Sequence, residues 1–152
     1  MAYQGRATGL SLSKLVEGQL QEVQNRFLSK MADAIVTRSP VWSGEYVSRH
    51  AIEGRSAQGQ FASNLEGWKP KTANPVEVKE SARANLQSSI SSLAIGNSVA
   101  FTNRVPHAYI VEKIGWRSPD GSLRVPPYEV YTGAATMANT FLQEAVNEVK
   151  SL

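Results

Sequence analysis

The sequence predicts an α+β fold in a single domain, and three observations support this prediction. Apolar residues recur at steps of three and four along three stretches, which is the spacing of one helical face. A short stretch at 98–103 has the composition of a strand, and the Pro-Asp-Gly turn at 119–121 is typical of a small hairpin. A length of 152 residues is enough for one buried core but too short for two full domains. We therefore expect two long amphipathic helices and a medium helix packed on a small antiparallel sheet.

The N-terminal part is expected to form a flexible arm followed by a long helix. Residues 1–10 are small and polar and contain glycine, so we place the arm there and the single domain at 11–152. From Ser13 to about Val36, the apolar positions share one helical face: Leu15, Val16, Leu20, Val23, Phe27, Met31, Ala34 and Ile35. The helix should end at Ser39, because residue 40 is proline and the residue before a proline is disfavoured in the α region.

The middle of the chain, residues 41–74, is predicted to be largely irregular. Its apolar and aromatic residues are scattered among four glycines and follow neither a helical nor a strand period. The piece from Glu45 to Ile52 is compatible with a short strand. The stretch GRSAQGQ is typical of a loop, so we expect a long, mobile loop at 54–64. Such a loop inside a compact domain is usually functional or ordered only on binding.

The medium helix is predicted to begin at Asn74. Asparagine is a good N-cap, Pro75 suits the first helical position, and Glu77 can reach back as in a capping box. One face of this helix then carries Val78, Ala82, Leu86, Ile90 and Leu93. A turn at Gly96 and Asn97 should lead into the strand at 98–103.

The C-terminal part is predicted to contain a short helix, a hairpin and the second long helix. Pro106 is suited to open a helix at His107–Ile114, which Gly115 should end. The hairpin follows, around the turn at 119–121. The last helix carries one apolar face to the C-terminus: Val130, Ala134, Met137, Phe141, Ala145 and Val149.

The composition excludes several classes of protein. The chain has no cysteine, which excludes a disulfide framework, thiolate metal sites and thiol catalysis. We find no apolar run of signal-peptide or membrane-spanning length, so we expect a protein that is neither secreted nor inserted in a membrane. Only 19% of residues are charged, and the resulting neutral polar surface suits contact with other protein.

Catalysis has little support in the sequence. His50 and His107 lie far apart in the chain and the acidic residues are spread singly, so we predict no metal site and no cofactor. The segment Trp42-Ser43-Gly44 lacks the glycine that a nucleophile elbow carries two residues before its serine. No Gly-x4-Gly-Lys-[Ser/Thr] phosphate loop is present. We therefore expect that the protein is not an enzyme and has no catalytic residues.

Contact with nucleic acid is an alternative function. The net charge of +3 is thinly spread along the chain and permits nucleic acid nearby without requiring it. The basic residues that could line one surface of the loop region are Arg38, Arg49, Arg55, Lys69 and Lys71. They would suit a weak contact with DNA that ignores base sequence, or they are simply solvated charges.

The three tryptophans all lie in irregular segments, at positions 42, 68 and 116. Some of them could cap the core. Tryptophan and tyrosine on loops are otherwise typical anchors of contacts between proteins.

Two stretches of the chain resemble a known family. Residues 38–48 (RSPVWSGEYVS) are similar to the thr-pro-val-asp-thr-gly-x-leu-x-x-ser signature that follows the first helix in the phage tail-component family of tail-completion or neck proteins. Residues 98–115 (SVAFTNRVPHAYIVEKIG) resemble that family's asn-x-x-pro-tyr-ala-x-x-val-glu-x-gly stretch. The helix after Pro126 and Pro127 occupies the place of its pro-phe-leu-x-pro-ala segment. Trp42 and Ser43 stand where the family has Asp and Thr.

The resemblance implies a structural virion protein at the head–tail junction of a tailed bacteriophage, present in the host cytoplasm during assembly. It implies a homo-oligomeric ring, commonly six- or twelve-fold, around the DNA channel, with neighbours such as the head connector or adaptor and the tail terminator or tail tube. Contact with genomic DNA would be non-specific, through the five basic residues above facing the channel. The candidate subunit-interface residues are Trp42, Tyr46, Tyr109, Glu112 and Trp116.

Overall fold

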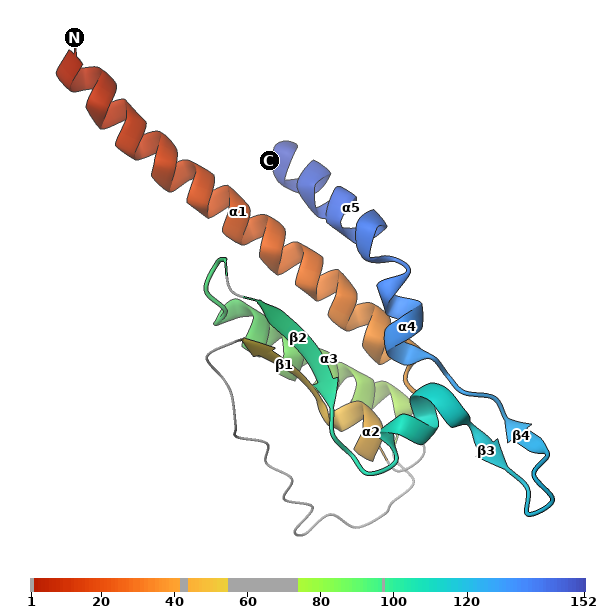
Figure 1. Cartoon of the computed structure of the whole chain (residues 1–152). Coiled ribbons are helices and arrows are strands. Elements are labelled where there is room, and N and C mark those ends of the chain that lie inside the picture. The colour runs from red at the N-terminus through yellow and green to blue at the C-terminus, as the bar shows by residue number, and fades with distance from the viewer. Residues whose placement is uncertain (1, 42–43, 55–73, 97) are drawn as a thin grey trace.

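The computed structural model describes the backbone of residues 2–41, 44–54, 74–96 and 98–152, and the side chains among them from Val16 on, except Glu53 and Gly54. The predicted α+β class is confirmed: three longer helices accompany two small antiparallel strand pairs (Figure 1). The predicted loop at 54–64 lies outside the described residues after Gly54.

Helix α1 (Ala2–Arg38) is the longest described element, and the other two longer helices pack against its C-terminal half (Figure 1). Its 37 residues correspond to roughly 55 Å at about 1.5 Å per residue. It begins at Ala2, well before the expected start near Ser13, so the backbone of residues 2–10 is helical where a flexible arm was predicted. Glycines 5, 9 and 18 weaken this helix without ending it, because glycine lowers helix stability far less than proline does. The helix ends before Pro40, as predicted.

The segment after α1 differs from its prediction. Gly44 has a φ of 85°, a left-handed conformation, and starts the short helix α2 (Glu45–Ser48), so the expected strand at Glu45–Ile52 is wrong in its first half. The amide of Ser48 donates to the carbonyl of Gly44 at 3.0 Å, which closes this helical turn. Strand β1 (His50–Gly54) begins only after it.

Strand β1 pairs antiparallel with β2 (Val99–Asn103), the strand predicted at 98–103. His50 lies opposite Asn103, and Gly54 lies opposite Val99. Helix α3 (Pro75–Ser91) precedes β2 and begins as predicted: the Asn74 side chain accepts hydrogen bonds from the amides of Val76 and Glu77.

The predicted short helix is the π-helical turn η1 (Ile110–Ile114), which Gly115 ends with a φ of 74°. The hairpin follows as strands β3 (Trp116–Arg117) and β4 (Leu123–Val125), around the predicted turn at 119–121. A Cβ at Gly115 would overlap the backbone of Val125 and Pro126. Glycine at this position therefore allows the base of the hairpin to lie against the end of η1.

The C-terminal helix expected from Val130 on is divided into α4 (Val130–Ala135) and α5 (Ala138–Lys150) by a short turn at 136–137. Gly133 and Thr136 near this turn are weak helix formers, and the Thr136 hydroxyl donates to the Gly133 carbonyl at 2.6 Å. Figure 1 shows α5 beside α1 on the side opposite to the sheet and α3, so α5 packs against the long helix.

Two clusters of buried residues form the core, and α1 contributes to both. The first joins α1 to α3 and the sheet: Leu28, Ala32, Val36, Val47, Ile52, Ala82, Leu86 and Ile90. The second joins α1 to η1 and α4: Ile35, Tyr46, Val105, Val111, Val130 and Ala134. The predicted apolar face of α3 is confirmed by the burial of Ala82, Leu86 and Ile90.

Candidate interaction surface

A buried polar network lies where the end of α1 meets β1, β2 and α4. The His50 ring lies 2.6 Å from the Ser39 hydroxyl through Nε2 and 2.6 Å from the Tyr131 hydroxyl through Nδ1. The Ser39 hydroxyl donates to the carbonyl of Ile35 at 2.7 Å, so its oxygen accepts from Nε2–H of a neutral imidazole. Nδ1 then accepts from Tyr131, and from the Asn103 amide at 3.2 Å. These bonds tie four segments of the chain together.

Burial lowers the pKa of His50 to about 4 and raises the pKa of Tyr131. The imidazole is therefore neutral and Tyr131 keeps its proton near pH 7, which matches the hydrogen bonds. Although Ser39 contacts a histidine, it is only 2% exposed and its proton is donated to a helix carbonyl. This geometry fits a structural connection and does not fit an activated nucleophile.

Glu112 caps helix α4. Its carboxylate accepts from the amides of Tyr131 at 3.1 Å and Thr132 at 2.9 Å, and from the Thr132 hydroxyl at 3.0 Å. Burial acts to raise the pKa of Glu112, but these hydrogen bonds outweigh burial and lower it. An ionised carboxylate at a helix N-terminus is favourable, so Glu112 fixes α4 to η1 within one chain.

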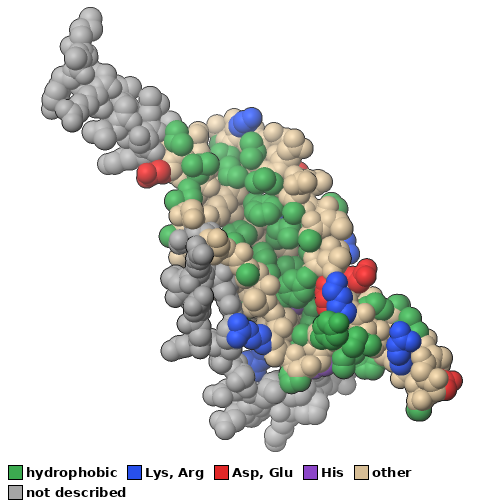
Figure 2. All heavy atoms as spheres, in the orientation of Figure 1, with side chains coloured by type: hydrophobic (Ala, Val, Ile, Leu, Met, Phe, Trp, Pro, Cys, Tyr) green, Lys and Arg blue, Asp and Glu red, His purple; other side chains and the backbone are tan. Residues whose placement is uncertain are grey.

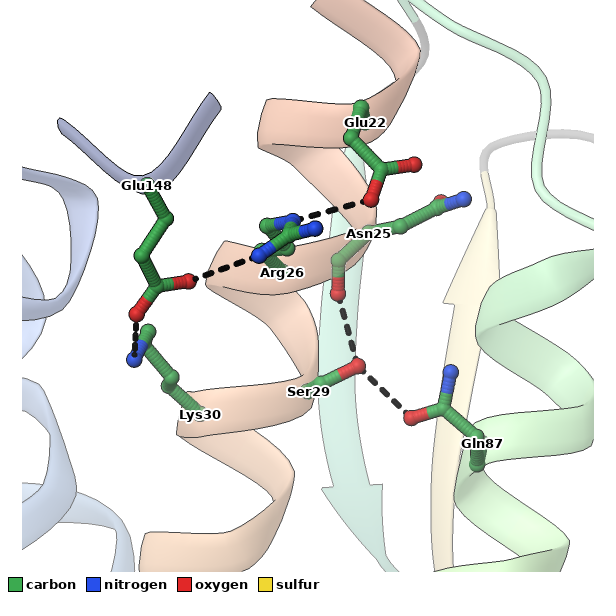
Figure 3. Close-up of a pocket in the computed structure, with 7 residues that line it drawn as sticks. All are labelled: Glu22, Asn25, Arg26, Ser29, Lys30, Gln87 and Glu148. Carbon is green, nitrogen blue, oxygen red and sulfur yellow. Dashed lines mark hydrogen bonds and ion pairs between the residues drawn. The ribbon is translucent and has the colours of Figure 1, made fainter. Parts of the chain in front are cut away.

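One side of the α1–α5 contact is held by ion pairs. Arg26 lies 3.3 Å from Glu148, and Lys30 lies 2.7 Å from Glu148 (Figure 3). Lys30 also lies 3.3 Å from Glu144. The hydrogen bond to Glu148 raises the pKa of Lys30, and the hydrogen bond to Lys30 lowers the pKa of Glu148. An open hollow of about 380 Å³ lies here between α1, α3 and α5. Because both cations that line it already face carboxylates, the hollow offers no excess charge to a ligand.

The other side of the same contact is apolar and open. Figure 2 shows hydrophobic side chains gathered in a stripe along α1 and α5. At its N-terminal end on α1, Val16 is 50% exposed and Leu20 53%. Farther along the contact, Leu142 of α5 is 44% exposed. Phe27 and Met31 continue the same helical face and are half-buried. We call Val16, Leu20, Phe27, Met31 and Leu142 the apolar stripe.

A second apolar group lies at the other end of the molecule, around η1 and the hairpin (Figures 1 and 2). Tyr109 is 67% exposed and Leu123 of β4 is 48% exposed, with Ile114 and Tyr128 less so. The amide of Tyr128 donates to the carbonyl of Val111 at 2.8 Å, which holds the segment after the hairpin against η1. We call the hairpin together with this segment, residues 116–128, the arm. Exposed apolar side chains that gather in one region are a common feature of protein contact sites.

The predicted interface residues are only partly brought together. Tyr109 is exposed, as an interface residue should be, and Trp116 is half-buried against the second core cluster. Tyr46 is 4% exposed and belongs to the core, so its prediction as a contact residue is corrected. Glu112 is occupied in capping α4, and Trp42 lies outside the described residues.

Most residues of the predicted basic surface lie outside the described residues. Arg55, Lys69 and Lys71 fall in the undescribed range 55–73. Arg38 lies at the end of α1 against α4, where a Cβ at Gly133 would overlap its guanidinium. Arg49 is the C-cap of α2. The alternative of a DNA contact therefore stays a prediction, which a binding titration at low salt would test.

Sequence reasoning missed two groups of residues. Leu20 was placed on the apolar face of α1 but is exposed, because periodicity identifies an apolar face and not what covers it, and Leu142 lies outside the predicted face of the last helix. The His50 network had no sequence signal, since its members are separated by up to 92 positions, from Ser39 to Tyr131.

The described residues contain no group of three or more histidine, aspartate or glutamate side chains placed to hold a metal ion. Within the same residues, no helix combines the length and the hydropathy needed to cross a lipid bilayer. The comparisons with known proteins found no matching family model, no similar curated protein and no similar solved structure.

Proposed function

We propose that this protein is a structural subunit of a phage head–tail junction, a neck or tail-completion protein that assembles as a homo-oligomeric ring. The observation that carries the proposal is the apolar stripe. A subunit that remained alone in water would leave Leu20, Leu142 and Val16 uncovered along the seam of two helices. A neighbouring subunit would cover them.

The shape of the molecule supports the same proposal. The stripe follows α1 and α5, whereas the exposed group lies on η1 and the arm, beyond the C-terminal end of α1 (Figure 1). A ring uses a different face of each subunit on its two sides, so a subunit needs two separate contact surfaces. The motifs at 38–48 and 98–115 add the resemblance to neck proteins. The described residues of the first motif form the end of α1 and helix α2, and those of the second form β2 and η1.

Within the virion, this role would require contacts with other neck and tail proteins as well as with copies of the same chain. The structural networks at His50 and Glu112 suit it, because they hold the contact surfaces in fixed positions. Pre-organised surfaces lose less entropy when they associate.

The proposal is tested in the phage that carries the gene. A nonsense mutation should produce filled heads beside separate, finished tails in negatively stained lysates. The variant Tyr109→Ala should give the same phenotype while the purified protein keeps its circular dichroism spectrum, because Tyr109 is largely exposed. Val76→Ala is the matched control, an exposed apolar residue on α3 away from both surfaces. Infectious virions from the nonsense mutant would refute the proposal.

A further inference from the structure

The arm is held firmly although it buries little of its own surface. A two-stranded hairpin alone is marginally stable in water. This one is fixed at its base, because Gly115 packs directly on the Val125 carbonyl and the Gly115 amide donates to Ile110 at 2.7 Å. At the tip, the Ser118 amide donates to Ser122 at 2.8 Å and Asp120 accepts from the Ser122 amide at 2.9 Å. The structure thus projects a preformed arm from the body of the molecule (Figure 1).

One face of the arm carries an apolar side chain beside a cation. Arg117 and Leu123 are cross-strand partners, so their side chains share a face of the hairpin. Arg117 donates to the carbonyl of Gly121 at 3.1 Å and has no carboxylate against it among the described residues. Arg124 has no cross-strand partner in the described hairpin, because the register between β3 and β4 shifts there, and its guanidinium donates to the Ser118 hydroxyl at 2.5 Å.

The exposed end of the apolar stripe carries the opposite charge. Glu17 precedes Leu20 by three positions, which makes their side chains neighbours on the surface of α1. Both residues are exposed, and no ion pair of Glu17 is found among the described residues. The pair Leu20 and Glu17, midway along α1, thus complements the pair Leu123 and Arg117 on the arm.

We propose that the arm of one copy docks on the exposed end of the apolar stripe of the next copy, with Leu123 against Leu20 and Arg117 beside Glu17. This inference rests on the proposed ring and names its repeating contact. The occupant of the stripe is a second copy because one chain carries both complementary surfaces, and because the middle of α1 and the arm lie apart, which leaves each free for a different neighbour.

Cysteine cross-linking tests the contact directly, since the natural chain contains no cysteine. Full-length Leu20→Cys and Leu123→Cys chains are mixed and oxidised. We expect a disulfide-linked heterodimer from the mixture, and a ladder of covalent multimers from the chain that carries both substitutions. Homodimers of Leu20→Cys would overturn the inference, because they would show a two-fold contact between α1 helices.

Charge reversal gives an independent measurement on the full chain. Arg117→Glu should weaken self-association about tenfold, as close interfacial charge pairs do when one partner is changed. The double variant Glu17→Arg with Arg117→Glu should restore it, whereas Arg124→Glu changes the net charge equally and should leave the association constant unchanged. Equal effects of Arg117→Glu and Arg124→Glu would overturn the inference.

The failure of the contact and the failure of the ring have different signatures. Native mass spectrometry reports multiples of the 16.6 kDa chain if the protein assembles. Multimers that persist without cross-links between positions 20 and 123 would overturn the contact and leave the ring standing. A chain that stays monomeric at all concentrations would contradict both.

Discussion

The two sides of the contact between α1 and α5 differ in chemistry. On one side, Arg26 and Lys30 meet Glu144 and Glu148, so each charge finds its partner within the chain. On the other side, Leu20 and Leu142 are left about half exposed. The contact between the two helices thus has paired charges on one side and exposed apolar side chains on the other. Exposed apolar area, and not charge, therefore suggests a partner here, because charges that are already paired within the chain need no further neighbour.

The largest expected effect comes from the middle of this seam. Ala145 of α5 is fully buried between the two sides. Ala145→Glu would place a carboxylate there without a partner and should lower the free energy of unfolding by about 3 kcal/mol or more. Urea denaturation followed by circular dichroism measures this. An unchanged urea midpoint would mean that the packing of α5 on α1 does not contribute to stability, so the two sides of that contact could not be compared.

The next largest effect is expected on the pH dependence of stability, through His50 in the polar network between the end of α1 and α4. Burial lowers the pKa of His50 from 6.5 to about 4, so the unfolded chain binds the proton more readily than the folded chain. The contribution of neutral His50 to stability is complete above pH 6.5 and is lost as the pH falls toward 4. It amounts to roughly 3 kcal/mol.

Urea midpoints between pH 7 and pH 4 test this prediction. His50→Asn should flatten the fall in stability across that window, whereas His107→Asn serves as the control with the other histidine and should keep it. The same slope in both variants would show that carboxylates alone account for the loss.

A substitution on the exposed apolar side of the α1–α5 contact should weaken self-association while the free energy of unfolding stays nearly constant. Leu142→Asp changes a side chain that is 44% exposed, so the unfolding free energy should change by less than about 0.5 kcal/mol. Self-association should weaken about tenfold, as when an apolar contact in an interface is replaced by a charge. Sedimentation velocity measures the dissociation constants of Leu142→Asp and of the control Val76→Asp. Equal dissociation constants for the two variants would contradict a role of the apolar stripe in self-association.

The smallest effect is expected on the paired side. Lys30→Met removes two ion pairs whose members are partly exposed, so the unfolding temperature should fall by at most ~2 °C. In 1 M salt the difference from the natural protein should disappear, because screening weakens the pairs already present. Self-association should not change. A loss of association in this variant would mean that the charged side also faces a partner.

The elements of the fold could be predicted from the sequence wherever a local signal was sufficient. Asn74 and Pro75 marked the start of α3, Pro40 marked the end of α1, and Gly115 marked the end of η1. The helical turn after Gly44 was missed, because four residues are too few to show a helical period. The division between α4 and α5 was missed for a similar reason, since the apolar spacing continues across the turn.

The exposed apolar groups could be predicted less well than the elements. Tyr109 was recognised from its place in a motif, and its exposure agrees with a contact role. Tyr46 was selected by the same reasoning and is buried, because an aromatic residue near a turn can point inward or outward with equal sequence support. Burial depends on which elements meet, and this information is not local. Leu20 and Leu123 could be found only after α5 and the hairpin had been placed.

Helix α1 also determines how the protein unfolds. Val36 belongs to the first core cluster and its neighbour Ile35 to the second, so the two clusters share one rigid backbone. Neither cluster can separate while these turns of α1 remain formed, and loss of these turns removes side chains from both. Local openings that release only one cluster are therefore suppressed, and the chain should unfold as one cooperative unit. The amides of residues 28–36 are then expected to exchange with solvent most slowly.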